Sequence, residues 1–250
     1  MNETEKDPTL RHLAALALVV AVLVAPGAMA NGKSLTLTTE NYPPFNMQDE
    51  ATGRIVGIST DIVRALMSRA GQNYQMSFLP WQRAFNDALT KPDTCVFSTT
   101  ETAERLPKFK WVGPLVENNW TLFGRADETM VIRSLNDART HVIGGYKGDA
   151  VALFLESKGF EQDLAAFDHL NPAKLAARRF DLWATGEFLG PYLAARAGVD
   201  IKPLYTFRET VMSMACNKAI DQLLIDRLNE VLKTLKQDGT VDRIVTRYKG

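Results

Sequence analysis

The sequence predicts an α/β protein of two lobes, each a mostly parallel sheet flanked by helices. Three observations support this fold class. Short runs of apolar and β-branched residues alternate with helical patterns, and this alternation begins a second time near residue 120. No low-complexity linker separates the two halves, so we expect ordered strands rather than a flexible tether to connect the lobes.

The first half of the chain alternates strand and helix patterns. We expect strands over residues 35–39, 74–79 and 95–99, and helices over residues 60–70 and 82–90. In the first helix, Ile62, Val63, Leu66 and Met67 fall on one face, and Gly71 can end the helix. This order of elements predicts parallel strands with helices on both faces of the sheet.

The second half repeats the alternation and ends in helices. We expect strands over residues 120–125, 141–146, 180–184 and 211–216. The expected helices cover residues 149–157, 172–178, 188–197, 220–237 and 241–248. The helix at 220–237 has a leucine-rich apolar side, which is typical of a helix packed on a core.

The N-terminal segment is typical of a secretory signal peptide. Residues 13–25 are apolar throughout, which is shorter than the roughly 20 residues that a membrane-spanning helix needs. Ala28-Met29-Ala30 fits the small-residue rule for cleavage, so we expect cleavage after Ala30 and a periplasmic mature protein. A buried N-terminal helix and an uncleaved anchor are the alternatives.

The composition narrows the classes of partner. The chain has 250 residues, 46% of them hydrophobic, and 29 basic residues balance 29 acidic ones. Without a basic excess, we expect neither nucleic acid nor an anionic membrane as a partner. The two cysteines and three histidines show no spacing typical of a metal site, so we expect no metal and no other cofactor.

Polar side chains follow the predicted strand at 95–99. Ser98 and Thr100 lie at its carboxyl end, and Arg105 follows shortly after. Open α/β sheets bind ligands at this edge, and a guanidinium offers two parallel donors to a carboxylate. The pattern therefore indicates a carboxylate site. The alternative is a polar strand end at which Arg105 pairs with Glu101 or Glu104 on the surface.

Aromatic and glycine-containing stretches mark further strand ends. Tyr42 and Trp81 each follow a predicted strand, where a ring can stack on a ligand or pack against the core. Gly148 and Asp149 lead from a strand into a helix, and the free N–H groups of such a turn favour an anion. An ordinary tight turn is the alternative there. Arg83 could bind ligand or face solvent.

Together these stretches resemble the family 3 extracytoplasmic solute-binding proteins, the polar-amino-acid receptors of ABC importers. The matching stretches include Tyr42-Pro43-Pro44-Phe45, Thr102-Ala103-Glu104-Arg105, Lys147-Gly148 and Gln237-Asp238-Gly239-Thr240. The resemblance covers the mature chain in order. It implies a two-lobed, type II periplasmic-binding-protein-like fold. Residues 1–30 would form the signal peptide, residues 31–119 and 212–250 lobe 1, and residues 120–211 lobe 2.

The resemblance also implies a set of ligand contacts. These are Tyr42, Trp81, Ser98, Thr100, Arg105, Gly148, Asp149 and Thr185. Arg105 would hold the ligand carboxylate, and Tyr42 and Trp81 would enclose the ligand. The acidic residue of the family that receives an α-ammonium group would fall at Thr185 or Gly186. The sequence therefore leaves open whether the ligand is an α-amino acid.

The function that follows is binding by hinge closure without catalysis. The partners would be a small carboxylate-bearing ligand and the membrane permease of an ABC importer, and the protein would be a monomer. A periplasmic dehydratase or lyase on the same scaffold is an alternative, with Glu187, Asp149 and Lys147 facing Arg105. A ligand-sensing module is another.

The topology of the family suggests a disulfide between Cys95 and Cys216. The returning strand that carries Cys216 would enter the first lobe beside the strand that carries Cys95. Neighbouring strands bring Cα atoms to about 4.5–5.5 Å, which suits a disulfide. Two buried free thiols are the alternative.

Overall fold

The computed structural model describes residues 34–248 of the chain. The predicted signal peptide and its cleavage site after Ala30 lie outside the described residues. Between residues 34 and 248, no helix combines the length and the apolar character needed to cross a membrane.

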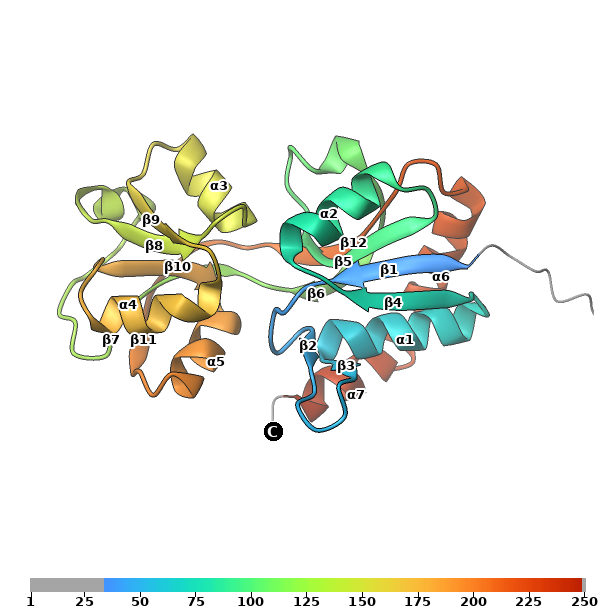
Figure 1. Ribbon diagram of the computed structural model, residues 1–250, viewed down its shortest axis with the longest axis horizontal. Helices are drawn as coiled ribbons and strands as arrows, with labels where there is room; N and C mark the ends of the chain where they lie inside the picture. The colour runs from blue at the N-terminus through green and yellow to red at the C-terminus, as the bar shows by residue number, and fades with distance from the viewer. Residues whose placement is uncertain (1–33, 249–250) are drawn as a thin grey trace, which may run out of the picture. The chain divides into compact units, whose positions relative to one another are not determined.

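The first of two five-stranded sheets holds the early strands and one late strand (Figure 1). Its order is β4-β1-β5-β12-β6. The strands are β1 (Leu35–Thr39), β4 (Tyr74–Phe78), β5 (Thr94–Thr100), β6 (Lys110–Glu117) and β12 (Val211–Cys216). They all run in one direction except β12, which is antiparallel to both of its neighbours.

The second sheet repeats this plan with the order β9-β8-β10-β7-β11. Its strands are β7 (Trp120–Arg125), β8 (Ile143–Tyr146), β9 (Gln162–Ala165), β10 (Leu182–Gly186) and β11 (Ile201–Arg208). Here β7 alone runs against its neighbours. The predicted fold class, with a mostly parallel sheet in each lobe, is confirmed.

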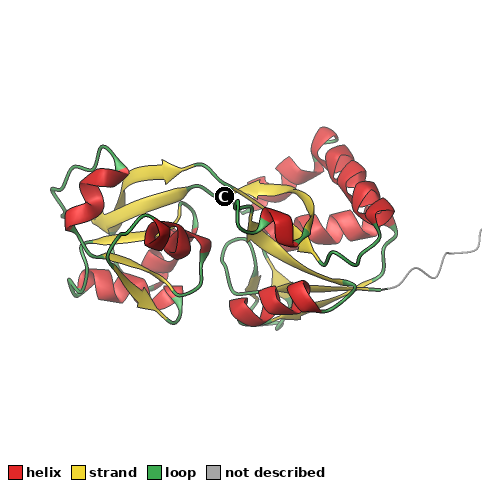
Figure 2. Cartoon of the chain, turned by 90° about the horizontal axis from the view of Figure 1, so that it is seen from above, coloured by secondary structure: helices red, strands yellow, loops and turns green. Residues whose placement is uncertain are grey.

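Helices flank both sheets (Figure 2). The first sheet carries α1 (Ile58–Ala70), α2 (Trp81–Thr90), α6 (Gln222–Gln237) and α7 (Thr240–Arg247), with α1 and α2 on opposite faces (Figure 1). The second sheet carries α3 (Ala150–Ser157), α4 (Asn171–Ala176) and α5 (Leu189–Arg196). The apolar face predicted for α1 is buried: Ile62, Val63, Leu66 and Met67 have no exposed surface. The helix ends at Gly71, whose positive φ of 61° suits a residue without a Cβ.

The strands that the sequence analysis missed lie mostly at sheet edges. β6 contains Pro114 and β11 contains Pro203, and proline is tolerated in edge strands because it cannot donate to a ladder. β9 is a short edge strand in which two of the four residues are polar. β2 (Met47–Gln48) and β3 (Ile55–Val56) form a separate two-stranded ladder of two residues each. Such segments lack the continuous apolar pattern that marks a buried strand.

The chain passes between the sheets twice, from β6 to β7 and from β11 to β12. The two passages are hydrogen-bonded to each other. The amide of Asn118 donates to the carbonyl of Thr210 (2.9 Å), and the amide of Thr210 donates to Oδ1 of Asn119 (3.2 Å). The Thr210 hydroxyl also donates to the carbonyl of Asn118. We refer to residues 118–119 and 209–210 as the crossover.

A disulfide joins two neighbouring strands of the first sheet. Cys95 of β5 and Cys216 of β12 are paired in register, with their Cα atoms 4.0 Å apart, and both are fully buried. The bond closes a loop with a sequence separation of 121 residues. It therefore fixes the returning strand to the first sheet, while the whole second sheet lies within the closed loop.

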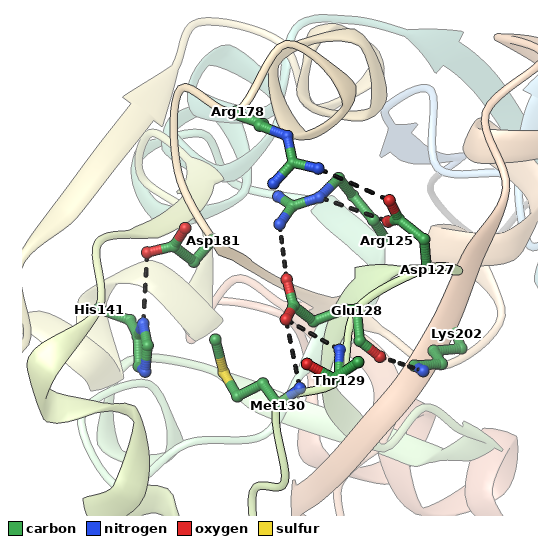
Figure 3. A network of polar contacts seen from close by, with 9 residues as sticks. All are labelled: Arg125, Asp127, Glu128, Thr129, Met130, His141, Arg178, Asp181 and Lys202. Atoms are coloured by element: carbon green, nitrogen blue, oxygen red, sulfur yellow. Dashed lines mark hydrogen bonds and ion pairs between the residues drawn. The ribbon is translucent and has the colours of Figure 1, made fainter.

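A network of ion pairs borders β7 and β11 of the second sheet (Figure 3). Arg125 is buried at the end of β7, and its Nη2 donates to Oε2 of Glu128 at 2.5 Å. Lys202 on β11 donates to the carbonyl of Glu128. Asp127 lies 3.7 Å from Nε of Arg125 and 3.6 Å from Nη2 of Arg178. These contacts hold the turn after β7, and none of the residues lines the cavities described below.

Candidate functional site

The candidate site lies where parallel strands of both sheets end. Loops after the carboxyl ends of β1, β4, β5, β8 and β9 carry its charged and aromatic side chains. The residues concerned are Glu40, Tyr42, Trp81, Arg105, Gly148, Asp149 and Asp168. Carboxyl ends of parallel strands are the usual binding edge of open α/β sheets. Segments far apart in the sequence thus converge on one region.

Two cavities meet at Trp81. The smaller has a volume of about 270 Å³, and Glu40, Tyr42, Tyr146 and Asp168 are among its lining residues. This volume lies just below the range of roughly 300–1,000 Å³ typical of drug-sized ligands, so it suits a smaller molecule. We refer to it as the acidic cavity.

The larger cavity, of about 930 Å³, has a basic lining. Arg83, Arg105, Lys108 and Arg208 line it together with Trp81. Arg208 is held over the rings of Trp120 and Phe154, with its Cζ atom 5.1 and 4.7 Å from the ring centres. We refer to it as the basic cavity. Glu104 is the one acidic residue of this lining, so Trp81 is shared by a cavity with an acidic lining and a cavity with a mostly basic lining.

Arg105 is the buried cation of the site. Its exposed fraction is 7%, and its Cζ atom lies 5.1 Å from the ring centre of Trp81 and 5.3 Å from that of Phe85. Nη1 makes a long hydrogen bond of 3.4 Å to the carbonyl of Thr100. No carboxylate among residues 34–248 forms an ion pair with it. The guanidinium is thus oriented by aromatic rings and has donors left for an anionic group.

Trp81 connects the two sheets at the site. It begins α2, has an exposed fraction of 6%, and its Nε1 donates to the carbonyl of Gly148 at 3.1 Å. Gly148 has a φ of +81°, and a Cβ atom there would lie 2.9 Å from Nε2 of Gln82. The positive φ favours glycine at 148, whereas the contact is with the end of a flexible, exposed side chain that can shift.

Three carboxyl groups lie at the site: Glu40, Asp149 and Asp168, which we call the acidic cluster. Burial raises the pKa of Glu40 well above its ordinary value, and the charges of Asp149 and Asp168 raise it further. Burial also raises the pKa of Asp149, against the opposing effect of Arg105. Asp149 additionally caps α3 by accepting from the amide of Val151 at 3.3 Å. Each carboxyl group thus lies in an environment that disfavours its charge.

Asp168 is held by three donors from neighbouring elements. Its Oδ1 accepts from Nε1 of Trp183 (3.0 Å) and Nδ2 of Asn171 (2.7 Å), and its Oδ2 accepts from the hydroxyl of Thr185 (2.8 Å). Burial nevertheless raises the pKa of Asp168 to about 6, and these hydrogen bonds oppose the rise. Thr185 therefore contributes to the site by orienting a carboxylate from another loop.

The end of β10 has no room for a side chain of its own. A Cβ atom at Gly186 would lie 2.4 Å from Oδ1 of Asn118 and 2.9 Å from the hydroxyl of Tyr42. The same hydroxyl accepts from Nδ2 of Asn118 at 3.1 Å. The loop that carries Tyr42 is thereby tied to the crossover. An acidic side chain at 186 is sterically excluded, and the neighbouring Thr185 instead donates to the carboxyl group of Asp168.

The remaining residues that the sequence analysis singled out do not line the acidic cavity. Ser98, with a φ of +59°, donates its hydroxyl to Oδ1 of Asn46 and lines neither cavity. Thr100 is buried and contributes its carbonyl to Arg105. Arg83 lines the basic cavity but is exposed. Glu187 lines a different cavity, and its Oε1 accepts from the amide of Asn119 at 3.4 Å.

Sequence reasoning missed Glu40, Tyr146 and Asp168. Glu40 directly follows β1 and Tyr146 ends β8, so the rule about carboxyl ends of strands could have found both. Asp168 follows β9, which carries too weak a strand pattern to be recognised. Within the described part of the chain, no group of three or more His, Cys, Asp or Glu residues is arranged to hold a metal ion.

Comparisons with known proteins identify relatives of the chain. A probable amino-acid ABC transporter-binding protein of Haemophilus influenzae is 22% identical over 228 residues, which cover 87% of this chain and 85% of that protein. A histidine kinase sensor domain with similarity to periplasmic binding proteins matches with a TM-score of 0.80 at 17% identity, over 87% of this chain and 96% of that one.

A third similar protein is an ancestral arginine-binding protein bound to arginine, with a TM-score of 0.75 and 22% identity. The match covers 87% of this chain and 98% of that one. At these identities the solved structures establish the fold alone. The model of the bacterial extracellular solute-binding proteins, family 3, matches residues 35–250. The chain therefore belongs to family 3 of the bacterial extracellular solute-binding proteins.

Proposed function

We propose that the protein is a periplasmic receptor that binds an amino acid or a related carboxylate-bearing compound between its two sheets and delivers it to an ABC importer. Binding would close the two lobes about the crossover, because a ligand that contacts both lobes stabilises the closed arrangement. The membrane permease would recognise the closed form. We propose lobe 1 as residues 31–119 and 212–250 and lobe 2 as residues 120–211.

The observation that carries this proposal is that Arg105 is buried and has no carboxylate partner among the described residues. A buried guanidinium without a carboxylate partner is costly unless another group compensates it. The rings of Trp81 and Phe85 orient it, and its best hydrogen bond, to the carbonyl of Thr100, is 3.4 Å long. A ligand carboxylate would complete this environment with two parallel charge-assisted hydrogen bonds.

The other predicted contacts have supporting roles in this proposal. Tyr42 and Trp81 would enclose the ligand, since both line the acidic cavity. Gly148 and Asp149 would contribute backbone groups from the second sheet. Thr185 would act through Asp168, to which its hydroxyl donates. Ser98 would support the site indirectly through Asn46.

The functions of similar proteins support an amino-acid ligand and an ABC partner. The relative from Haemophilus influenzae is a probable amino-acid ABC transporter-binding protein, and one similar structure holds arginine. We further propose that the protein acts as a monomer and catalyses no reaction. Another similar structure is an ancestral amino-acid-binding protein described as a precursor of cyclohexadienyl dehydratase, so turnover needs a direct test.

Titration calorimetry with a panel of L-amino acids tests the proposal. We expect at least one member to bind with a micromolar or tighter dissociation constant and to be recovered chemically unchanged. Binding should require the carboxylate, so the corresponding amine without that group should bind at least about 30-fold more weakly. Binding of the amine with equal affinity would contradict the role of Arg105, and conversion of the ligand would indicate an enzyme.

A further inference from the structure

We propose that the basic cavity holds a second anionic group of the ligand, and that Arg208 of the second sheet is the anchor of this group. The inference rests on the proposed function and specifies its substrate class. The ligand would carry two anionic groups joined by a short apolar chain, as a dicarboxylic amino acid does. Arg105 would bind one of them and Arg208 the other, so a single ligand would connect both sheets.

Arg208 is held in place by aromatic rings of the second sheet and its helix α3. It is the last residue of β11, where it pairs with Trp120 of β7. Its Cζ atom lies 5.1 Å from the ring centre of Trp120 and 4.7 Å from that of Phe154. These two rings and the ring of Phe207 contact one another, with centres 5.6–6.2 Å apart. The guanidinium thus lies against a packed cluster of rings, which restricts its position.

Arg208 has a permanent charge and no ion-pair partner in the described chain. It is partly buried, and no carboxylate of residues 34–248 forms an ion pair with it. An arginine stays protonated at every physiological pH. Arg105 shows the same combination in the first sheet, where it is buried against Trp81 and Phe85 without an ion pair. Each sheet therefore presents one guanidinium that aromatic rings orient and whose donors are left for an anion.

The two arginines share one cavity. Both line the basic cavity, whose volume of about 930 Å³ lies within the range of roughly 300–1,000 Å³ typical of ligand sites. Glu104 also lines it, from an exposed position and without an ion pair to either arginine. Hydrogen bonds from its own amide and from Thr102 lower the pKa of Glu104, and the charges of Arg208 and Arg105 lower it further. Both guanidiniums therefore act on the same carboxylate, which agrees with their place in one cavity.

The rest of the lining suits the apolar chain between the two anionic groups. Leu89 of α2 and Leu153 of α3 line the cavity with exposed fractions of 40% and 49%. Arg83 and Lys108 line it as well, but both are exposed, so solvent screens their charges. They add to the positive potential that attracts an anion without offering a fixed contact. Arg208 is therefore the residue of the second sheet that can fix a second anionic group.

The chemistry of the guanidinium predicts which ligands are selected. A side-chain carboxylate can accept two parallel charge-assisted hydrogen bonds from Arg208. The amide of the same shape offers one neutral oxygen and a donor group that cannot pair with a guanidinium. A basic side chain would place a like charge beside Arg208. We therefore expect acidic amino acids to be preferred over their amides and over basic amino acids.

Titration calorimetry at pH 7.5 with matched pairs of ligands tests the inference. The acids are L-aspartate, L-glutamate and L-2-aminoadipate, which differ in the distance between their carboxylates, and each is compared with its side-chain amide. We expect at least one acid to bind about 30-fold or more tightly than its amide, and more tightly than L-arginine and L-lysine.

Variants locate the effect at Arg208. For the preferred pair, Arg208→Met should reduce the ratio of the two dissociation constants to less than about threefold and leave the amide within about threefold of its original affinity. Both ligands are measured on the same variant, so a general disturbance of the fold would weaken both. Arg105→Met, in contrast, should weaken both, because both carry the α-carboxylate. The matched control is Arg179→Met, since Arg179 is an exposed arginine near the second sheet that lines neither cavity and should leave the ratio unchanged.

The outcomes separate this inference from the proposed function. If a neutral or basic amino acid binds as tightly as every acid, the second anionic group is wrong and the receptor function stands. If Arg208→Met keeps the full ratio, or weakens acid and amide alike, Arg208 is not the anchor and the receptor function again stands. If no amino acid of any charge binds, both are wrong.

Discussion

Replacement of Arg105 by methionine removes the positive charge of the site while keeping an unbranched side chain between the rings of Trp81 and Phe85. The fold should tolerate the change. The guanidinium gives up one hydrogen bond of 3.4 Å and two ring contacts at 5.1 and 5.3 Å, and methionine restores favourable contacts between its sulfur and the aromatic rings. We expect the free energy of unfolding to change by less than about 2 kcal/mol.

Ligand binding should respond far more strongly to Arg105→Met than stability does. Loss of one partner of a buried charge pair costs about 2–5 kcal/mol, which corresponds to an increase of about 30- to 5,000-fold in Kd. The upper part of this range applies if the ligand carboxylate is left without any donor, because Arg105 is 7% exposed and water has little access to its position.

The assay is titration calorimetry with the amino acid that binds most tightly to the unmodified protein. Arg83→Met is the matched control, since Arg83 lines the same basic cavity but is exposed. We expect it to change Kd by less than about threefold. An unchanged affinity in Arg105→Met, with the fold verified by circular dichroism, would refute the assignment of Arg105 as the carboxylate anchor.

Three further predictions concern the disulfide, the tryptophan and the pH dependence. The double variant Cys95→Ala/Cys216→Ala should lose about 2–5 kcal/mol in its free energy of unfolding, measured by urea denaturation. It should bind ligand normally, because the disulfide lies within one sheet. A loss under about 1 kcal/mol would contradict this prediction. Trp81→Phe removes the indole N–H that donates to the carbonyl of Gly148 at 3.1 Å. The variant should lose most of the ligand-induced change in tryptophan fluorescence. A change as large as that of the unmodified protein would place Trp81 outside the site. Asp168 has a pKa of about 6 in the folded protein against about 3.9 when unfolded, so the folded state binds more protons between these values. The free energy of unfolding without ligand should therefore fall as the pH rises from about 4 to about 6, less steeply in Asp168→Asn, and an identical slope in both proteins would contradict the raised pKa.

The sequence was sufficient to predict the fold class and several of the residues that the structure brings together at the candidate site. Amphipathic helices such as α1 were predictable because an apolar face with helical spacing must be buried. The position of Arg105 at the candidate site was predictable because it follows the buried strand β5, whose carboxyl end had to lie at the edge of the sheet where open α/β sheets bind ligands.

Other features depended on contacts that no local pattern encodes. Asp168 belongs to the site because β9 pairs with β8 at a sheet edge and because Thr185, on β10, donates to it. The position of Ser98 likewise follows from a long-range contact, since its hydroxyl is directed to Asn46. Local propensity is decisive for regular, buried elements, whereas edge strands and loop side chains are positioned by tertiary contacts.

Native mass spectrometry of the protein tests the central claim most directly. The protein would be purified without denaturation, weighed intact, and then denatured so that any released small molecule can be identified. We predict one small carboxylate-bearing ligand for each chain, absent from purified Arg105→Met and recovered chemically unchanged after prolonged incubation with the unmodified protein. A protein that carries no such ligand and takes up none from an amino-acid mixture, or one that converts it to a product, would contradict the account.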